Sequence, residues 1–172
     1  MTPEKAKTIA DFLATNMGHE QTITRKVLLA LPDNQMNWSP NEKGFNAGDL
    51  AWHIATAEVF FLMGVVNGEF TQSKAPDRPA SVADIVAFYD QNVPPLIEKA
   101  KNLTAEQAAK TITFAIFTYP AAVFLQLAGS HSVHHRGQLA AYLRTMGEKV
   151  PSIYGPSADE KIDLATGKAQ SA

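Results

Sequence analysis

The sequence predicts an all-α protein built as a four-helix bundle. Four long segments carry apolar residues at three- and four-residue steps, and turn-forming residues gather between those segments. The chain of 172 residues has the length of one domain and can bury a sizeable core without disulfides. We therefore expect a single helix-bundle domain over residues 1–172, with a C-terminal tail from about residue 148.

The first predicted helix spans residues 3–31. Thr2 is a suitable cap, Pro3 suits the first helical position, and Pro32 ends the helix. Its inward face, by spacing, is expected to consist of Ile9, Phe12, Leu13, Met17, Ile23, Val27, Leu28 and Leu31.

A loop over residues 33–45 separates this helix from the second, which runs over residues 47–67 with Asn46 as its cap. Trp38 and Phe45 are the expected anchors of the loop on the bundle. The seam of the second helix is expected to be Leu50, His53, Ile54, Ala57, Phe61 and Gly64.

The third predicted helix opens at Ser81, which together with Asp84 resembles a capping box. Pro94 lacks the amide proton that would bond to Asp90, and Pro95 follows it, so a kink or a break is expected there. The inward face of this helix is expected to be Val82, Ile85, Val86, Tyr89, Val93, Leu96 and Ile97.

The end of the chain contains one ambiguous stretch and the last helix. A second capping box lies at residues 104–107, and residues 111–119 then alternate like a strand. No second strand is evident to pair with that stretch, so we expect an extended connection laid across the bundle. Pro120 suits the first position of a helix that runs to Met146, with Gly147 as its C-terminal cap. The first part of the tail beyond it is expected to pack and its end to fray.

The composition excludes several classes of function. A net charge of -2 with scattered Lys and Arg argues against a nucleic-acid partner. The absence of cysteine excludes disulfides, thiolate metal sites and a cysteine nucleophile, so any thiol chemistry must use an external thiol. The N-terminus lacks the apolar core of a signal peptide, and apolar runs such as VFFLMGVV are too short to span a bilayer. We therefore expect a soluble, cytoplasmic protein without a membrane partner.

Histidines stand on the predicted seams of two helices. His131 and His135 lie about 40° apart around the last helix and one turn apart along it, so both rings can face one point. His134 also lies close in azimuth, but toward the edge of the apolar seam. His53 lies on the seam of the second helix. One such histidine is commonly a buried residue with an ordinary hydrogen-bond partner, whereas three together indicate a divalent metal site. Histidine-only ligation suits zinc, nickel, iron or copper.

Two segments, DLAWHIATAE at residues 49–58 and HSVHHRGQLAAYLRTMG at residues 131–147, resemble the signature segments of the DinB / YfiT-like superfamily. The approach WSPNEKGFNAGDLAWH, with its tryptophan before the first histidine, is also similar to that group. The resemblance implies an up-down-down-up four-helix bundle that forms a homodimer. It also implies one divalent metal ion on His53, His131 and His135, with His134 outside the ligand set.

The resemblance also implies a function with a small-molecule substrate. Some relatives are transferases or isomerases that use low-molecular-weight thiols such as bacillithiol or mycothiol, and others are called metal-dependent hydrolases. Hydrolysis normally needs a nearby general base, and Glu58 lies about 140° around the helix from His53. The residues therefore favour a thiol-dependent S-transferase. A hydrolase and a non-catalytic metal-binding stress-response bundle stay open as alternatives.

Other polar residues complete the set of candidates for the site. Tyr89 and Tyr142 are interpreted as core residues whose phenols could reach the metal pocket. Asn16 and Glu20 interrupt the inner face of the first helix and are candidates to line a polar cavity near the metal. Arg136 is expected to pair with a carboxylate on a neighbouring helix or subunit.

Overall fold

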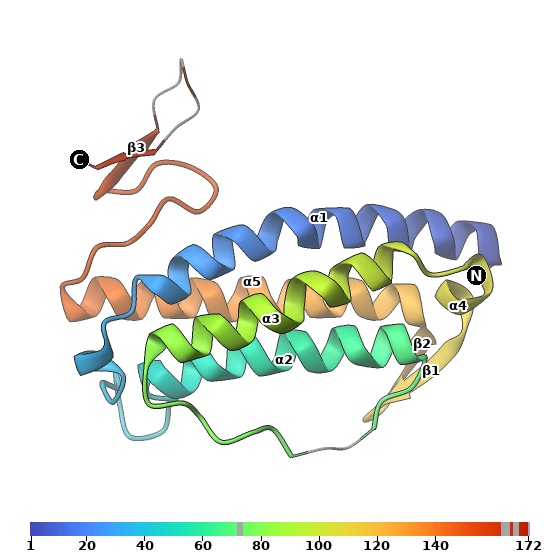
Figure 1. Ribbon diagram of the computed structural model, residues 1–172, viewed down its shortest axis with the longest axis horizontal. Helices are drawn as coiled ribbons and strands as arrows, with labels where there is room; N and C mark the ends of the chain where they lie inside the picture. The colour runs from blue at the N-terminus through green and yellow to red at the C-terminus, as the bar shows by residue number, and fades with distance from the viewer. Residues whose placement is uncertain (72–73, 163–165, 167–168, 172) are drawn as a thin grey trace.

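Four long helices lie side by side in the computed structural model, which describes residues 1–71, 74–162, 166 and 169–171. Figure 1 shows the first and the last of them running in one direction and the second and the third in the opposite direction. This is the up-down-down-up order. The predicted all-α four-helix bundle is confirmed. The helices are α1 (Pro3–Leu29), α2 (Ala47–Asn67), α3 (Val82–Lys101) and α5 (Ala121–Met146).

Each long helix packs against two neighbours. Helices α1 and α2 both contact α3 on one side and α5 on the other, so the four elements enclose a common core. Shorter elements occupy the connections and the tail: η1 (Asp33–Gln35), α4 (Ala105–Ala109), β1 (Thr111–Phe114), β2 (Phe117–Pro120), β3 (Glu160–Ile162) and β4 (Ala169–Ser171).

The helix starts have the caps that the sequence indicates. The side chains of Thr2, Asn46 and Ser81 each accept a hydrogen bond from a backbone amide in the first turn that follows. Thr104 and Gln107 form the reciprocal bonds of a capping box at α4. These local signals set where each helix begins, although Pro120 stands at the cap of α5 rather than at its first helical position.

Of the kink or break predicted at Pro94 and Pro95 in α3, the break does not occur. The helix is continuous from Val82 to Lys101 and includes Pro94 and Pro95. Val93 and Ile97, on either side of the prolines, are buried in the core. Packing of both halves on the same core therefore holds the helix together despite the missing backbone hydrogen bonds.

The inward face of α1 also differs from the prediction. Phe12 is 72% exposed and Ile9 is exposed as well, while Ala6, Ala10 and Ala14 are fully buried. Small side chains at four-residue steps allow the backbones of neighbouring helices to approach closely. The buried stripe of α1 is therefore made of alanines at its N-terminal end, and the larger apolar residues there face outward.

Residues 111–120 form a hairpin instead of the predicted extended connection. Strands β1 and β2 pair antiparallel, with Phe114 opposite Phe117. Ala115 takes a left-handed φ of 52° in the two-residue turn, a conformation for which glycine or asparagine is the usual signal. Because alanine stands there, the sequence carries no turn signal and hides the second strand.

Helix α2 is long and apolar enough, by length and composition alone, to cross a membrane. The uninterrupted apolar runs within α2, such as VFFLMGVV, are nevertheless too short to span a bilayer. More than half of its most apolar window, 56%, is buried inside the bundle. Core packing accounts for that burial, so the composition of α2 is weak evidence for a membrane span.

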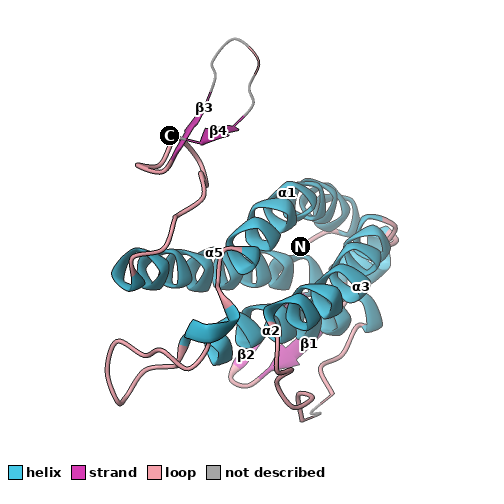
Figure 2. Ribbon diagram, turned by 60° about the vertical axis from the view of Figure 1, so that its left-hand side comes forward, coloured by secondary structure: helices cyan, strands magenta, loops and turns pink. Residues whose placement is uncertain are grey.

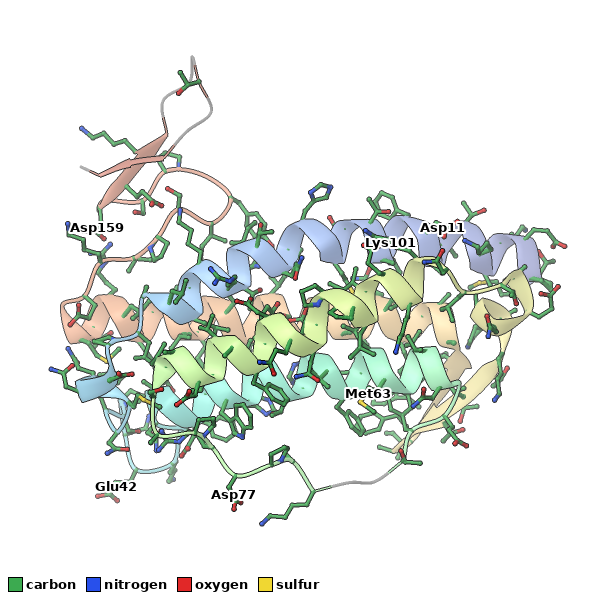
Figure 3. All side chains as sticks on the ribbon, viewed as in Figure 1. Asp11, Glu42, Met63, Asp77, Lys101 and Asp159 are labelled. Atoms are coloured by element: carbon green, nitrogen blue, oxygen red, sulfur yellow. The ribbon has the colours of Figure 1, made fainter. Side chains whose placement is uncertain are left out.

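The first part of the tail packs on the bundle, as predicted. Asp159, which is labelled in Figure 3, pairs with Arg144 of α5. Glu160 pairs with Lys26 of α1. Glu160 is the first residue of β3, and β3 and β4 form a hairpin that otherwise stands away from the four helices (Figure 2). The predicted fraying of the chain end falls partly outside the described residues.

Candidate metal centre

Three histidine side chains meet between α2 and α5. The Nε2 atoms of His53 and His131 lie 3.2 Å apart. With His135 they form a group whose three ligand nitrogens all lie within 4.8 Å of one another. Among the described residues, no other group of three His, Cys, Asp or Glu side chains is close enough to hold a metal ion.

Helix geometry explains the convergence. His131 and His135 are one turn apart on α5, and their ring centroids are 4.4 Å apart. Helix α2 packs along α5 and brings the His53 ring to 5.0 Å from the His131 ring and 4.7 Å from the His135 ring. Residues 78 positions apart in the sequence thus share one point in space.

The donor set fits a divalent transition-metal ion. A tetrahedral zinc ion with bonds of about 2.0–2.1 Å places two ligand nitrogens about 3.3 Å apart. The 3.2 Å between the Nε2 atoms of His53 and His131 agrees with this requirement. Three imidazole nitrogens and no carboxylate favour such an ion over magnesium or calcium.

Burial keeps the imidazoles of His53 and His131 neutral. Burial lowers the pKa of His131 to about 4, and the neighbouring His135, His53 and His134 lower it further. Burial also lowers the pKa of His53, with a second contribution from His135. Neutral rings offer their lone pairs to a cation, so the crowding prepares the histidines as ligands.

Gln138 orients the third histidine, a role the sequence analysis missed. The Nδ1 atom of His135 donates to Oε1 of Gln138 over 3.0 Å, while Nε2 of Gln138 donates to the hydroxyl of Tyr142 over 3.1 Å. This arrangement leaves Nε2 of His135 free to accept a cation. Gln138 follows His135 by three positions, a helical spacing that could have identified it.

The loop between α1 and α2 lies over one edge of the centre. Phe45 stacks on the His53 ring with the centroids 5.2 Å apart. Trp38 packs edge-on against Tyr142 at 5.3 Å. Both predicted anchors therefore contact the bundle beside the histidines, and Tyr142 reaches the centre through Gln138.

The other candidates lie farther from the three nitrogens. His134 is exposed and belongs to no metal-binding group, although its ring is 4.8 Å from that of His135. Asn16 and Glu20 line a small cavity of about 180 Å³ between α1 and α5, and none of the three histidines lines it. Tyr89 is fully buried and donates to Glu58 rather than to the centre.

Glu58 lies in the core and outside the histidine group, as its position on α2 predicts. It is 3% exposed, and its Oε2 atom accepts hydrogen bonds from Ser132 over 2.8 Å and from Tyr89 over 3.1 Å. Burial raises the pKa of Glu58 to about 7, while these two hydrogen bonds and the charge of Arg136 oppose the rise.

Arg136 binds the predicted carboxylate partner on a neighbouring helix. Its Nη2 atom lies 2.7 Å from Oε2 of Glu20, and its Nη1 atom donates to Thr24 over 3.2 Å. The hydroxyl of Tyr154 in the tail accepts from Arg136 and donates to Glu20. We call the set of Glu20, Thr24, Glu58, Tyr89, Ser132 and Arg136 the core polar network.

The raised pKa of Glu58 predicts a pH-dependent stability. The unfolded chain releases this proton near pH 4.5 and the folded protein near pH 7, so the free energy of unfolding falls as the pH rises between these values. Glu58→Gln is neutral throughout. Between pH 5 and pH 8 the free energy of unfolding of wild type should therefore fall by about 2–3 kcal/mol more than that of Glu58→Gln. Urea denaturation at the two pH values measures this difference.

Glu69→Gln, at an exposed position just beyond α2, is the matched control and should keep the wild-type pH profile. Parallel profiles for wild type and Glu58→Gln would show that Glu58 ionises as an ordinary surface carboxyl does.

Comparison with known proteins places this geometry in a family. The sequence of YrdA from Bacillus subtilis strain 168, an uncharacterized protein, is 29% identical over 147 residues, which cover 82% of this chain and 85% of YrdA. YjoA from the same strain, also uncharacterized, is 24% identical over 139 residues, or 78% of this chain and 88% of YjoA.

Solved structures share the fold. A DinB-like protein from Bacillus cereus ATCC 10987 gives a TM-score of 0.71 at 25% identity, over 83% of this chain and 95% of that one. The DinB-like protein YjoA gives 0.67 at 21% identity, over 82% and 96%. The sequence model of the DinB family matches residues 4–165, a stretch that contains the three histidines. The chain therefore belongs to the DinB family.

Proposed function

We propose that this protein is a metal-dependent S-transferase that joins a low-molecular-weight thiol to a small electrophilic substrate. The convergence of three imidazoles from α2 and α5, two of which have a lowered pKa, is the observation that carries the proposal. A divalent ion held by three neutral ligands keeps its full charge and lowers the pKa of a thiol at an open coordination position.

Each side chain of the metal centre has a separate role in the proposed reaction. His53, His131 and His135 would hold the ion, and Gln138 fixes the ring orientation of His135. Phe45, stacked on His53, limits the access of water to one side of the ion site. The chain has no cysteine, so the thiol is an external reactant.

The surroundings favour thiol transfer over hydrolysis. No carboxylate oxygen belongs to the histidine group in the part of the chain that the structure describes. Glu58 is occupied by Ser132 and Tyr89 in the core. A hydrolase would need a base to take a proton from water, whereas a thiol starts near pKa 8.5 and ionises without one beside an ion.

The activity is tested with 1-chloro-2,4-dinitrobenzene and a small thiol. The thiolate sulfur attacks the carbon that bears chlorine, a C–S bond forms, the C–Cl bond breaks, chloride leaves, and the thiol proton passes to solvent. We expect the metal-loaded protein to accelerate thioether formation, followed by absorbance, and His135→Ala to lose more than about 100-fold of that rate. Elemental analysis of protein purified without a histidine tag identifies the ion to load.

His134→Ala is the matched control, because it removes a neighbouring imidazole that lies outside the group, and it should retain the rate. Metal-dependent cleavage of model esters without thioether formation would replace the proposal by the hydrolase. No turnover in either assay would favour a non-catalytic metal-binding bundle.

A further inference from the structure

A cavity of about 590 Å³ lies beside the metal centre, and His53 belongs to both. We propose that this cavity binds the apolar body of an elongated, uncharged substrate whose reacting end lies at His53. The inference rests on the proposed function, since it names the class of electrophile that the transferase would accept. A volume of this size lies in the range of about 300–1,000 Å³ that is typical of small-molecule sites.

The shape of the cavity follows one face of α2. His53, Ala57, Phe60, Gly64 and Asn67 line it at three- and four-residue steps. Fourteen residues of helix correspond to about 21 Å, so the wall is long compared with the width of one aromatic ring. Only an elongated ligand would use this wall from the metal centre to the far end.

Aromatic rings form a continuous part of the cavity wall. Phe60, Phe70 and Phe114 contact one another with centroids 5.1–5.4 Å apart. Phe88 of α3 forms part of the opposite wall and packs on Trp52 at 4.7 Å. This surface recognises an alkyl chain or fused rings through burial and ring contacts.

Two polar side chains in the wall, those of Thr56 and Asn92, already have partners. The hydroxyl of Thr56 donates to the carbonyl of Trp52, and the amide of Asn92 donates to the carbonyl of Phe88. A ligand group placed against these protons would have to displace internal hydrogen bonds. The wall around Thr56 and Asn92 therefore favours an apolar part of the ligand.

The charges at the cavity do not select an ion. The two charged side chains among its lining residues, Glu69 and Lys74, have opposite signs and belong to exposed residues. Lys74 also pairs with Asp77. A ligand charge of either sign would meet one repulsive and one attractive neighbour in contact with water, so the arrangement suits an uncharged molecule.

The test uses the uncharged fluorescent probe N-phenyl-1-naphthylamine with the metal-loaded protein and no thiol. Straight-chain primary alcohols from hexanol to dodecanol then compete for the cavity. The affinity of the alcohols should rise about fourfold for each added methylene group until the chain fills the wall. Thiol transfer is not involved, so this result is independent of the activity assay.

Two variants locate the probe. Ala57→Phe should weaken its binding about tenfold or more, because the ring fills the space next to His53. Met63→Glu should also weaken binding. Met63 lines the cavity but is 45% exposed at the surface of α2, so this change leaves the core intact (Figure 3). Ala87→Phe, at an exposed position of α3 outside the lining, is the control and should bind as wild type.

Probe binding that is absent, that does not increase with chain length, or that survives both cavity variants would overturn the inference. If the protein binds the probe as expected but transfers no thiol, the cavity assignment stands and the proposed reaction is wrong. If it transfers thiol to 1-chloro-2,4-dinitrobenzene but fails the probe test, the reaction stands and the substrate class is wrong.

Discussion

Alanine at His53, His131 or His135 is expected to abolish stoichiometric metal binding, whereas His134→Ala should retain one ion per chain. The reason is geometric, since each of the three nitrogens lies within 4.8 Å of the other two and His134 stands outside the group. Two imidazoles cannot hold a divalent ion against water as three do, because each lost ligand removes a direct bond.

The ion content is measured by elemental analysis after dialysis of untagged protein. Gln138→Ala should keep the ligands but weaken metal affinity about 10- to 100-fold, as loss of an outer-shell partner does. All variants should keep the far-UV circular dichroism of a helical protein, because the core is formed by the four helices without the ion. Retention of metal by His135→Ala together with its loss in His134→Ala would show that the ligand assignment is wrong.

Loss of Arg136 is expected to destabilise the fold by about 3–5 kcal/mol, the range for breaking a buried ion pair. Arg136 is 1% exposed and lies 2.7 Å from the carboxylate of Glu20. Its charge also opposes the rise in the pKa of Glu58. In Arg136→Met a side chain of similar length remains, but both carboxylates lose their nearby positive charge and Thr24 loses its donor.

The free energy of unfolding from urea denaturation at pH 7 measures this effect. Arg25→Met is the matched control, because Arg25 binds both carboxylate oxygens of Asp90 at 2.8 Å but lies at the surface. An exposed pair of this kind contributes about 0–1 kcal/mol. Tyr154→Phe, which removes the tail's hydroxyl from the pair, should cost about 1 kcal/mol. Equal losses for Arg136→Met and Arg25→Met would contradict a stabilising role for the core polar network.

The core polar network could be predicted only in part from the sequence. The partner of Arg136 was predicted as a carboxylate on a neighbouring helix, and Glu20 is that partner. The sequence did not indicate that Glu58, Tyr89 and Ser132 would join the same buried region. Those contacts depend on the rotation of α2, α3 and α5 about their own axes, which periodicity defines only within a residue or so.

Local chemistry in the sequence was sufficient for the helix starts and for the histidine pair. Thr2, Asn46, Ser81 and Thr104 cap the helices because their side chains bond to amides three residues away, an interaction that needs no tertiary contact. The spacing of His131 and His135 likewise places two rings on one face of any helix.

The remaining features depend on tertiary packing. Ala6, Ala10 and Ala14 turn inward because close helix packing rewards small side chains, and α3 passes Pro94 and Pro95 because both halves pack on one core. The β1–β2 hairpin forms through a turn without glycine, which no local signal announces. The position of His53 beside His131 and His135 depends on the axial register between α2 and α5. That register is set by the whole helix interface, because the side chains of each helix pack into the grooves of the other along their shared length.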